Sequence, residues 1–79
     1  MANEANLVLY VKPGCPFCQK VLNYLAQHDR QIETRNVFEG TNLDDLVRIG
    51  GKNQAPCLLI DGAPLYESDD IIAWLEAHN

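Results

Sequence analysis

Two cysteines separated by two residues, Cys15 and Cys18, are the side chains of this sequence best suited to chemistry. They follow the apolar run 7–11 and precede a helical pattern of apolar residues, so we predict them at a strand-to-helix turn. Free backbone N–H groups, the helix dipole and the nearby Lys12 favour a thiolate at Cys15, and Pro16 suits the first helical position. Because the thiolate is the nucleophile in thiol–disulfide exchange, we predict that Cys15 attacks and that Cys18 resolves, the two forming a redox-active disulfide.

The same spacing also supplies half of a tetrahedral zinc site or the two ends of a structural disulfide. The further cysteine and histidine candidates, Cys57, His28 and His78, show no paired ligand spacing. A disulfide that closes so short a loop removes little entropy from the unfolded chain. Reversible redox chemistry is therefore favoured over both alternatives, and no metal is expected.

Composition limits the kind of protein and its partners. The chain has 79 residues, 47% of them hydrophobic, which predicts a single domain over residues 1–79 with a modest core. Its formal net charge of −5 disfavours nucleic acid and anionic membranes as partners, since both repel an acidic protein. No apolar stretch is long enough to span a membrane, and the polar segment 1–6 lacks the pattern of a signal peptide. Three cysteines with one close pair fit a catalytic dithiol in a reducing compartment, so we expect a cytoplasmic protein. We also expect it to be a monomer.

The hydrophobic pattern predicts the element order β-α-β-α-β-β-α. Strands are expected at 7–11, 31–37, 57–60 and 63–66, and helices at 16–28, 41 or 42 to about 50, and 69–77. Thr41 or Asn42 is predicted to cap the second helix and Ser68 the third. A right-handed crossover makes the first two strands parallel, the turn Asp61-Gly62 makes the last two antiparallel, and Pro64 suggests an edge strand. The helix residues expected to face inward are Val21, Leu22, Leu25, Ile71, Ile72, Trp74 and Leu75.

This element order, with Cys-x-x-Cys after the first strand, resembles the thioredoxin fold and, at this length, the glutaredoxin family. The resemblance covers nearly the whole chain. Its most specific part is K-P-G-C-P-F-C at 12–18, close to the family's K-P-x-C-P-Y-C with Phe17 in place of tyrosine. The segment Gln54-Ala55-Pro56 aligns with the family's T-V-P. The resemblance implies an α/β fold with a four-stranded mixed sheet and three helices, and a cis bond before Pro56 that faces the cysteines.

A third motif, Glu67-Ser68-Asp69-Asp70, stands where glutaredoxins often have G-G-x-D-D. Its Glu-Ser pair is instead similar to a helix start in the N-terminal half of glutathione transferases. Both families bind the γ-glutamyl carboxylate of glutathione there, where free N–H groups, a hydroxyl and the helix dipole favour an anion. The resemblance implies that Ser68 binds this carboxylate and that Asp69 pairs with the ligand's ammonium. Both residue types are also common helix caps, so capping alone is the alternative.

By the same resemblance, glutathione is the expected co-substrate, and no tightly bound cofactor is expected. Lys12 is expected to contact the thiolate or a glutathione carboxylate, and Ala55 to pair with the ligand through its backbone. Lys52 and Gln54 lie where relatives hold the glycine carboxylate, although a loop lysine is usually solvated. Cys57 is predicted to be a small core residue. The predicted glutathione-binding residues are Lys12, Phe17, Gln54, Ala55, Pro56, Glu67, Ser68 and Asp69.

Together these features predict a dithiol glutaredoxin that uses glutathione to reduce protein disulfides and glutathione mixed disulfides. Its expected partners are therefore disulfide-containing or glutathionylated proteins. One alternative is glutathione conjugation as in the transferases, suggested by Glu67-Ser68, although the chain stops at Asn79 before any second, helical domain. Another alternative is an iron–sulfur carrier that ligates a cluster through Cys15 and glutathione across a dimer. By resemblance, Pro16 and Cys18 disfavour the carrier.

Overall fold

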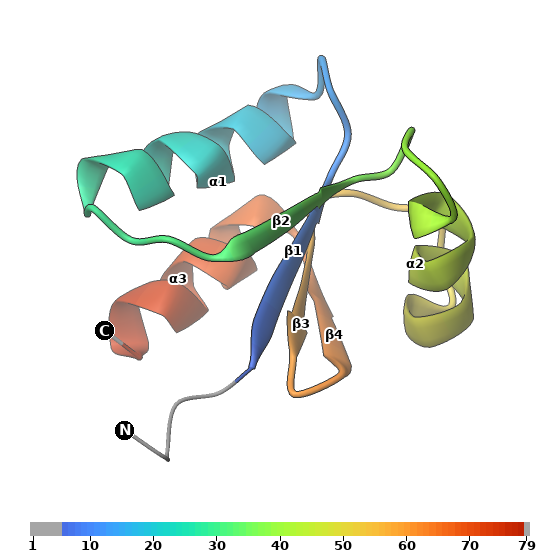
Figure 1. The fold of residues 1–79 in the computed structure, drawn as a ribbon. Helices are drawn as coiled ribbons and strands as arrows, with labels where there is room; N and C mark the ends of the chain where they lie inside the picture. The colour runs from blue at the N-terminus through green and yellow to red at the C-terminus, as the bar shows by residue number, and fades with distance from the viewer. Residues whose placement is uncertain (1–5, 79) are drawn as a thin grey trace.

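The protein is a four-stranded mixed sheet covered by helices on both faces, as the computed structural model shows for residues 6–78 (Figure 1). The elements are β1 (Leu7–Val11), α1 (Pro16–Gln27), β2 (Glu33–Asn36), α2 (Asn42–Gly50), β3 (Cys57–Ile60), β4 (Ala63–Tyr66) and α3 (Ser68–Ala77). The strand order is β2-β1-β3-β4, with β2 parallel to β1 and the other two pairings antiparallel. This arrangement is the thioredoxin fold, so the predicted fold class and strand directions are confirmed.

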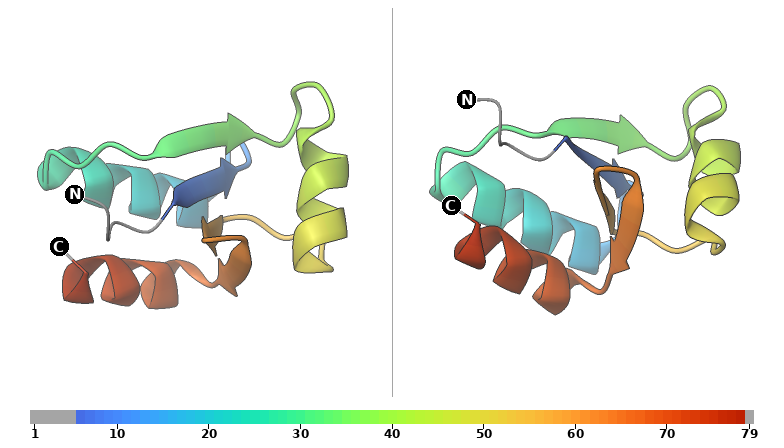
Figure 2. Two further views of the ribbon diagram at one scale, coloured as in Figure 1. Left: turned by 60° about the horizontal axis from the view of Figure 1, so that its bottom comes forward. Right: turned by 90° about the horizontal axis from the view of Figure 1, so that it is seen from below.

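The sheet separates two packed layers, because side chains of a strand alternate between its faces. Leu9 and Val11 of β1 face α1 and α3, which lie together on one side of the sheet (Figures 1 and 2). Val8 and Tyr10 face α2 on the other side. All four side chains are buried, so β1 supplies both layers of the core.

The first helix, α1, begins at Pro16 as predicted and ends at Gln27, with His28 as its C-cap. Val21 and Leu25 are buried against the sheet, as expected for this helix face. Leu22 is only half-buried, whereas Tyr24 is buried in its place. The helix is therefore rotated slightly from the face that the aliphatic residues alone predict.

The second strand, β2, is shorter than the predicted 31–37 at both ends. Ile32 lies outside the ladder, and its carbonyl accepts a hydrogen bond from the hydroxyl of Thr34 at 3.0 Å. Val37 donates its N–H to the carbonyl of Val11 at 2.9 Å, but the chain then turns into the loop before α2. Because β1 ends at Val11, it offers β2 no further partner residue.

The second helix, α2, has Thr41 as its N-cap residue, one of the two predicted candidates, but Thr41 makes no side-chain capping bond. The helix ends at Gly50, and its C-cap residue Gly51 takes the left-handed conformation with φ 80° that glycine adopts without a steric penalty. Leu46 is fully buried against the sheet. Val47 and Ile49, which continue the apolar pattern, are 42% and 37% exposed. Only a narrow stripe of apolar side chains on this helix therefore packs against the sheet.

The third helix, α3, begins one residue earlier than predicted, at Ser68. The prediction that Ser68 caps this helix is wrong, because Glu67 is the N-cap residue and Ser68 is already helical. Ile71 and Leu75 are fully buried as expected. The predicted burial of Ile72 and Trp74 is wrong, since both are half-buried at the edge of the layer shared with α1.

The hairpin of β3 and β4 forms as its turn residues predict. Asp61 and Gly62 have φ values of 51° and 87°, the positive pair that a tight two-residue turn between twisted strands requires. Pro64 lies in β4 at the edge of the sheet, where a missing N–H costs no ladder hydrogen bond. No helix within residues 6–78 is long and apolar enough to cross a membrane.

Candidate active site

The nucleophile candidate Cys15 stands at the N-cap of α1, directly after the turn that leaves β1. Its N–H donates to the carbonyl of Lys12 at 3.2 Å, and its carbonyl accepts from the N–H of Gln19 at 3.0 Å. Gly14 supports this turn with φ 83°, a conformation that side chains rarely adopt. Cys15 is half-buried, so its sulfur stays within reach of a substrate.

The first turn of α1 lowers the pKa of the Cys15 thiol, chiefly because the backbone N–H of Cys18 donates to its sulfur. Partial burial opposes this effect, while the Cys18 thiol and the N–H of Phe17 reinforce it. The positive charge of Lys12 makes the smallest of these contributions to the lowered pKa. The helix start, more than the neighbouring lysine, therefore favours the thiolate.

The second thiol, Cys18, lies in the opposite environment. It is only 2% exposed and belongs to the core between the sheet, α1 and α3. This burial raises the pKa of Cys18 to about 11, although the backbone N–H of Lys12 donates to its sulfur at 3.3 Å. Cys18 is therefore a protonated thiol at neutral pH, in hydrogen-bond contact with Cys15.

A cavity of about 220 Å³ opens beside the start of α1. Three segments distant in sequence build it: the first turn of α1, the loop before β3 and the start of α3. The peptide bond between Ala55 and Pro56 is cis, as the resemblance implied, and the carbonyl oxygen of Ala55 lies 4.0 Å from the sulfur of Cys15. The cavity is lined by Phe17, Gln54, Ala55, Pro56, Glu67 and Ser68, six of the eight predicted glutathione-binding residues.

The other two predicted residues, Lys12 and Asp69, lie outside this lining. Lys12 is exposed at the turn before Cys15. The carboxylate of Asp69 forms an ion pair with the ammonium of Lys20, which projects from α1. Sequence reasoning missed Lys20, although it lies one helical turn after Phe17 and therefore on the same side of α1.

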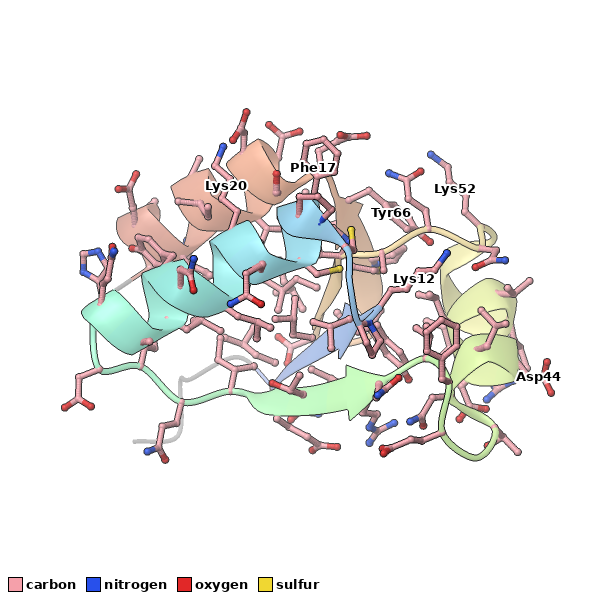
Figure 3. The ribbon with its side chains drawn as sticks, turned by 90° about the horizontal axis from the view of Figure 1, so that it is seen from above. Lys12, Phe17, Lys20, Asp44, Lys52 and Tyr66 are labelled. Carbon is pink, nitrogen blue, oxygen red and sulfur yellow. The ribbon has the colours of Figure 1, made fainter. Side chains whose placement is uncertain are left out.

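The three lysines of the chain are arranged around the site, unlike its three arginines. Figure 3 shows Lys12 and Lys52 on one side of Phe17 and Lys20 on the other. The ammonium of Lys52 lies 4.9 Å from the ring centre of Tyr66, within the range of a cation–π contact. The arginines are held elsewhere: Arg35 by Glu33, Arg48 by Asp45 and Arg30 by carbonyls at the end of α3.

Cys57 is fully buried on the face of the sheet that α2 covers, as predicted for a core residue. Burial raises the pKa of its thiol, which lies beside the hydroxyl of Tyr66. Tyr66 is the last residue of β4, and its ring reaches the end of α2. A Cβ added to Gly50 there would overlap the hydroxyl oxygen of Tyr66. Cys57 is thus separated by the sheet from the layer that holds Cys18.

The histidines considered as metal ligands make aromatic contacts at the ends of two helices. The ring of His28 lies 4.2 Å from that of Tyr24, and the ring of His78 stacks on Trp74 at 3.9 Å. Across residues 6–78, no three side chains of His, Cys, Asp or Glu are grouped in a way that could hold a metal ion.

Residues 9–79 match the family described as glutathione S-transferase, N-terminal domain. The chain belongs to this family. A rice glutathione S-transferase crystallised in complex with glutathione is 28% identical, with a TM-score of 0.73 over 96% of this chain and 34% of that chain. Glutaredoxin 2 from Chlamydomonas reinhardtii is 25% identical, with a TM-score of 0.68 over 94% of this chain and 74% of that chain.

Among curated proteins, the chain is similar to a hybrid peroxiredoxin from Haemophilus influenzae. The two are 27% identical over 70 residues, which is 86% of this chain and 28% of that protein. The chain therefore spans little more than a quarter of this curated relative. The chain is thus a glutaredoxin-like protein of the thioredoxin fold, related to the N-terminal domains of glutathione transferases.

Proposed function

We propose that this protein is a glutathione-dependent thiol–disulfide oxidoreductase, with Cys15 as nucleophile and Cys18 as resolving thiol. The observation that carries the proposal is the contrast between an accessible thiol whose pKa is lowered and a buried thiol whose pKa is raised. Similarity to a glutaredoxin and to a hybrid peroxiredoxin supports the redox class. Similarity to a transferase crystallised with glutathione supports glutathione as co-substrate.

The simpler proposed reaction removes glutathione from a mixed disulfide. The Cys15 thiolate attacks the sulfur of the glutathione moiety, forming a disulfide with it and releasing the substrate thiolate, which takes a proton from water. The thiolate of a second glutathione then attacks the sulfur of the bound glutathione. Cys15 leaves as a thiolate, and the two glutathione molecules leave as glutathione disulfide. Glutathione has therefore been oxidised by two electrons and the substrate disulfide reduced by two.

The second proposed reaction reduces a disulfide within a protein, and it needs both cysteines. Attack by Cys15 gives a mixed disulfide with the substrate and frees one substrate thiolate. Cys18 then loses its proton and attacks the sulfur of Cys15, which releases the second substrate thiolate and leaves a disulfide between Cys15 and Cys18. Two glutathione molecules reduce this disulfide and become glutathione disulfide.

The cavity beside Cys15 is the proposed glutathione site. The backbone of Ala55, which lines the cavity next to the attacking sulfur, is proposed to pair with the ligand's cysteine residue as an added strand. Ser68 and the first N–H groups of α3 are proposed to bind the γ-glutamyl carboxylate. Phe17, which is 63% exposed, forms one wall, and Lys12 offers a positive charge at the edge of the site.

Two cysteine variants test the proposed roles. Cys18→Ser should keep most of the activity on a small glutathione mixed disulfide, because that reaction needs one nucleophile, whereas Cys15→Ser should lose it. With a protein disulfide, Cys18→Ser should accumulate a mixed disulfide with the substrate, visible by mass analysis without reductant. Cys57→Ser is the control and should retain both activities, since that thiol lies on the far face of the sheet. Activity retained by Cys15→Ser in either assay would contradict the assignment.

A second candidate function is conjugation of glutathione to an electrophile, because the family match is to transferase N-terminal domains. Here the thiolate of glutathione itself attacks, and a halide leaves from an aryl halide substrate. Turnover of an aryl halide by Cys15→Ser, with no disulfide reduction by the wild type, would favour this candidate over the oxidoreductase.

A further inference from the structure

The start of α3 carries three carboxylates where the proposed site binds an anion. Glu67, Asp69 and Asp70 stand within one helical turn of Ser68. Like charges at this point repel a ligand carboxylate and offset the benefit of the helix N-terminus. Two contacts reduce this repulsion: the amide of Gln54 donates to Glu67 at 3.1 Å, and the ammonium of Lys20 pairs with Asp69.

The ion pair of Lys20 and Asp69 lies beside the cavity without filling it. Asp69 follows Ser68, and Lys20 lies one turn after Phe17, and both of those neighbours line the cavity. The side chains of Lys20 and Asp69 are 54% and 80% exposed. Both charges are therefore hydrated and free to turn toward a ligand, and neither has to leave a buried partner to do so.

We infer that Lys20 is a specificity-determining residue of this site: with Asp69 it recognises the zwitterionic α-amino-acid end of the γ-glutamyl group. Asp69 pairs with the ligand's ammonium, and Lys20 pairs with its carboxylate. An amino acid carries these two charges on one carbon, so a cation and an anion held side by side match both at once. The inference rests on the proposed function, because it adds a residue to the proposed glutathione site.

Two glutathione analogues separate the two contacts, each supplied as a mixed disulfide with the same small thiol, because the moiety that becomes joined to Cys15 occupies the cavity. One lacks the ammonium (glutaryl-cysteinyl-glycine), and the other lacks the α-carboxylate (4-aminobutyryl-cysteinyl-glycine). With the wild type, the mixed disulfide without ammonium should have a kcat/KM about tenfold below that of the glutathione mixed disulfide, the loss expected for one charge-assisted contact. The mixed disulfide without carboxylate should fall further, because it loses Ser68 and the N–H groups of α3 as well as Lys20. In Lys20→Gln, the kcat/KM for the glutathione mixed disulfide should fall about tenfold, whereas that for the analogue without carboxylate should not change, so the ratio of the two should narrow about tenfold.

The remaining variants check that the effect belongs to Lys20. Asp69→Asn should show the reverse pattern, losing discrimination against the analogue without ammonium, and Lys20→Arg should keep the wild-type pattern. Lys52→Gln makes the same charge change on the other side of Phe17 and should change kcat/KM by the same factor for all three mixed disulfides. An unchanged ratio of kcat/KM among the three mixed disulfides in Lys20→Gln, with or without a loss of stability, would show that Lys20 only clamps α1 to α3. A wild type unable to use glutathione with any disulfide would instead overturn the proposed function.

Discussion

One helical turn separates two thiols of opposite character. The sulfur of Cys15 accepts hydrogen bonds from N–H groups at the N-terminus of α1. Cys18 lies in the core, where bulk water cannot stabilise a negative charge on its sulfur. The lowered pKa thus makes more thiolate available at Cys15 than at a free thiol, while the pKa of about 11 keeps the Cys18 thiol protonated at neutral pH. The order of attack follows from the hydrogen bonds to the Cys15 sulfur and from the burial of the Cys18 sulfur, rather than from the sequence spacing alone.

The lowered pKa of Cys15 predicts its alkylation behaviour. The rate of alkylation by iodoacetamide should rise with pH around a midpoint below that of a free thiol, because more thiolate is present at neutral pH. Lys12→Gln should move the midpoint upward only modestly, since the backbone N–H groups contribute more than the lysine charge. In Cys15→Ser, Cys18 should react appreciably only at strongly alkaline pH.

Arg48→Gln provides the control for the alkylation experiment, because it removes the same charge from α2, where the arginine pairs with Asp45. It should leave the Cys15 midpoint unchanged. A Cys15 midpoint equal to that of a free thiol would contradict the role given to the helix start.

At the scale of elements, α2 and β4 meet through one aromatic side chain and one glycine. The hydroxyl of Tyr66 lies over Gly50 in the last turn of α2. The ring atom Cζ of Tyr66 is 3.2 Å from the position that a Cβ on Gly50 would take. This hydroxyl is buried without a hydrogen-bond partner among residues 6–78. Glycine at position 50, the last residue of α2, therefore has a packing reason, because a larger side chain there would overlap Tyr66.

Gly50→Ala should lower the free energy of unfolding by about 1–3 kcal/mol, because overlap with Tyr66 outweighs the better helix propensity. Tyr66→Phe alone should cost little, since the hydroxyl that it removes has no partner among the described residues. The double variant should recover part of the loss. Urea unfolding of the four proteins measures this, and purely additive effects would show that the two side chains do not conflict.

At the scale of the whole molecule, Arg30 connects the loop after the first helix to the last helix. It lies between α1 and β2, and its guanidinium donates to the carbonyls of Leu75 at 2.8 Å and His78 at 3.2 Å. These carbonyls belong to the end of α3, where a positive charge also complements the helix dipole. One side chain thus holds together the two helices that cover the same face of the sheet (Figure 2).

Arg30→Ala should lower the free energy of unfolding by about 1.5–3 kcal/mol, the range for hydrogen bonds to a charged group. Arg30→Lys should fall between this variant and the wild type, because a lysine cannot reach two carbonyls in the same planar geometry. Arg48→Ala, which breaks an exposed pair with Asp45, should cost about 0–1 kcal/mol. Equal urea midpoints for Arg30→Ala and Arg48→Ala would contradict this role of Arg30.

The sequence by itself determined the kinds of element, their order and the turn that holds Cys15, because these depend on local patterns. Alternation and helical periodicity locate β1, β3 and α1, and Asp61-Gly62 predicts the hairpin turn whose backbone angles the structure has. The Cys-x-x-Cys spacing places one thiol at a helix start and the other one turn later, whatever the rest of the chain does. These features follow from the backbone preferences of neighbouring residues, which the sequence shows directly.

Only the tertiary structure decided which residues meet at the cavity and which helix residues are buried. Phe17, Ala55 and Ser68 converge because three separate segments pack at one end of the sheet, and the motif resemblance anticipated this meeting where periodicity did not. The pairing of Lys20 with Asp69 and the half-burial of Trp74 were not anticipated. They depend on the position of α1 against α3, which follows from the packing of the whole core and leaves no signature in either helix alone.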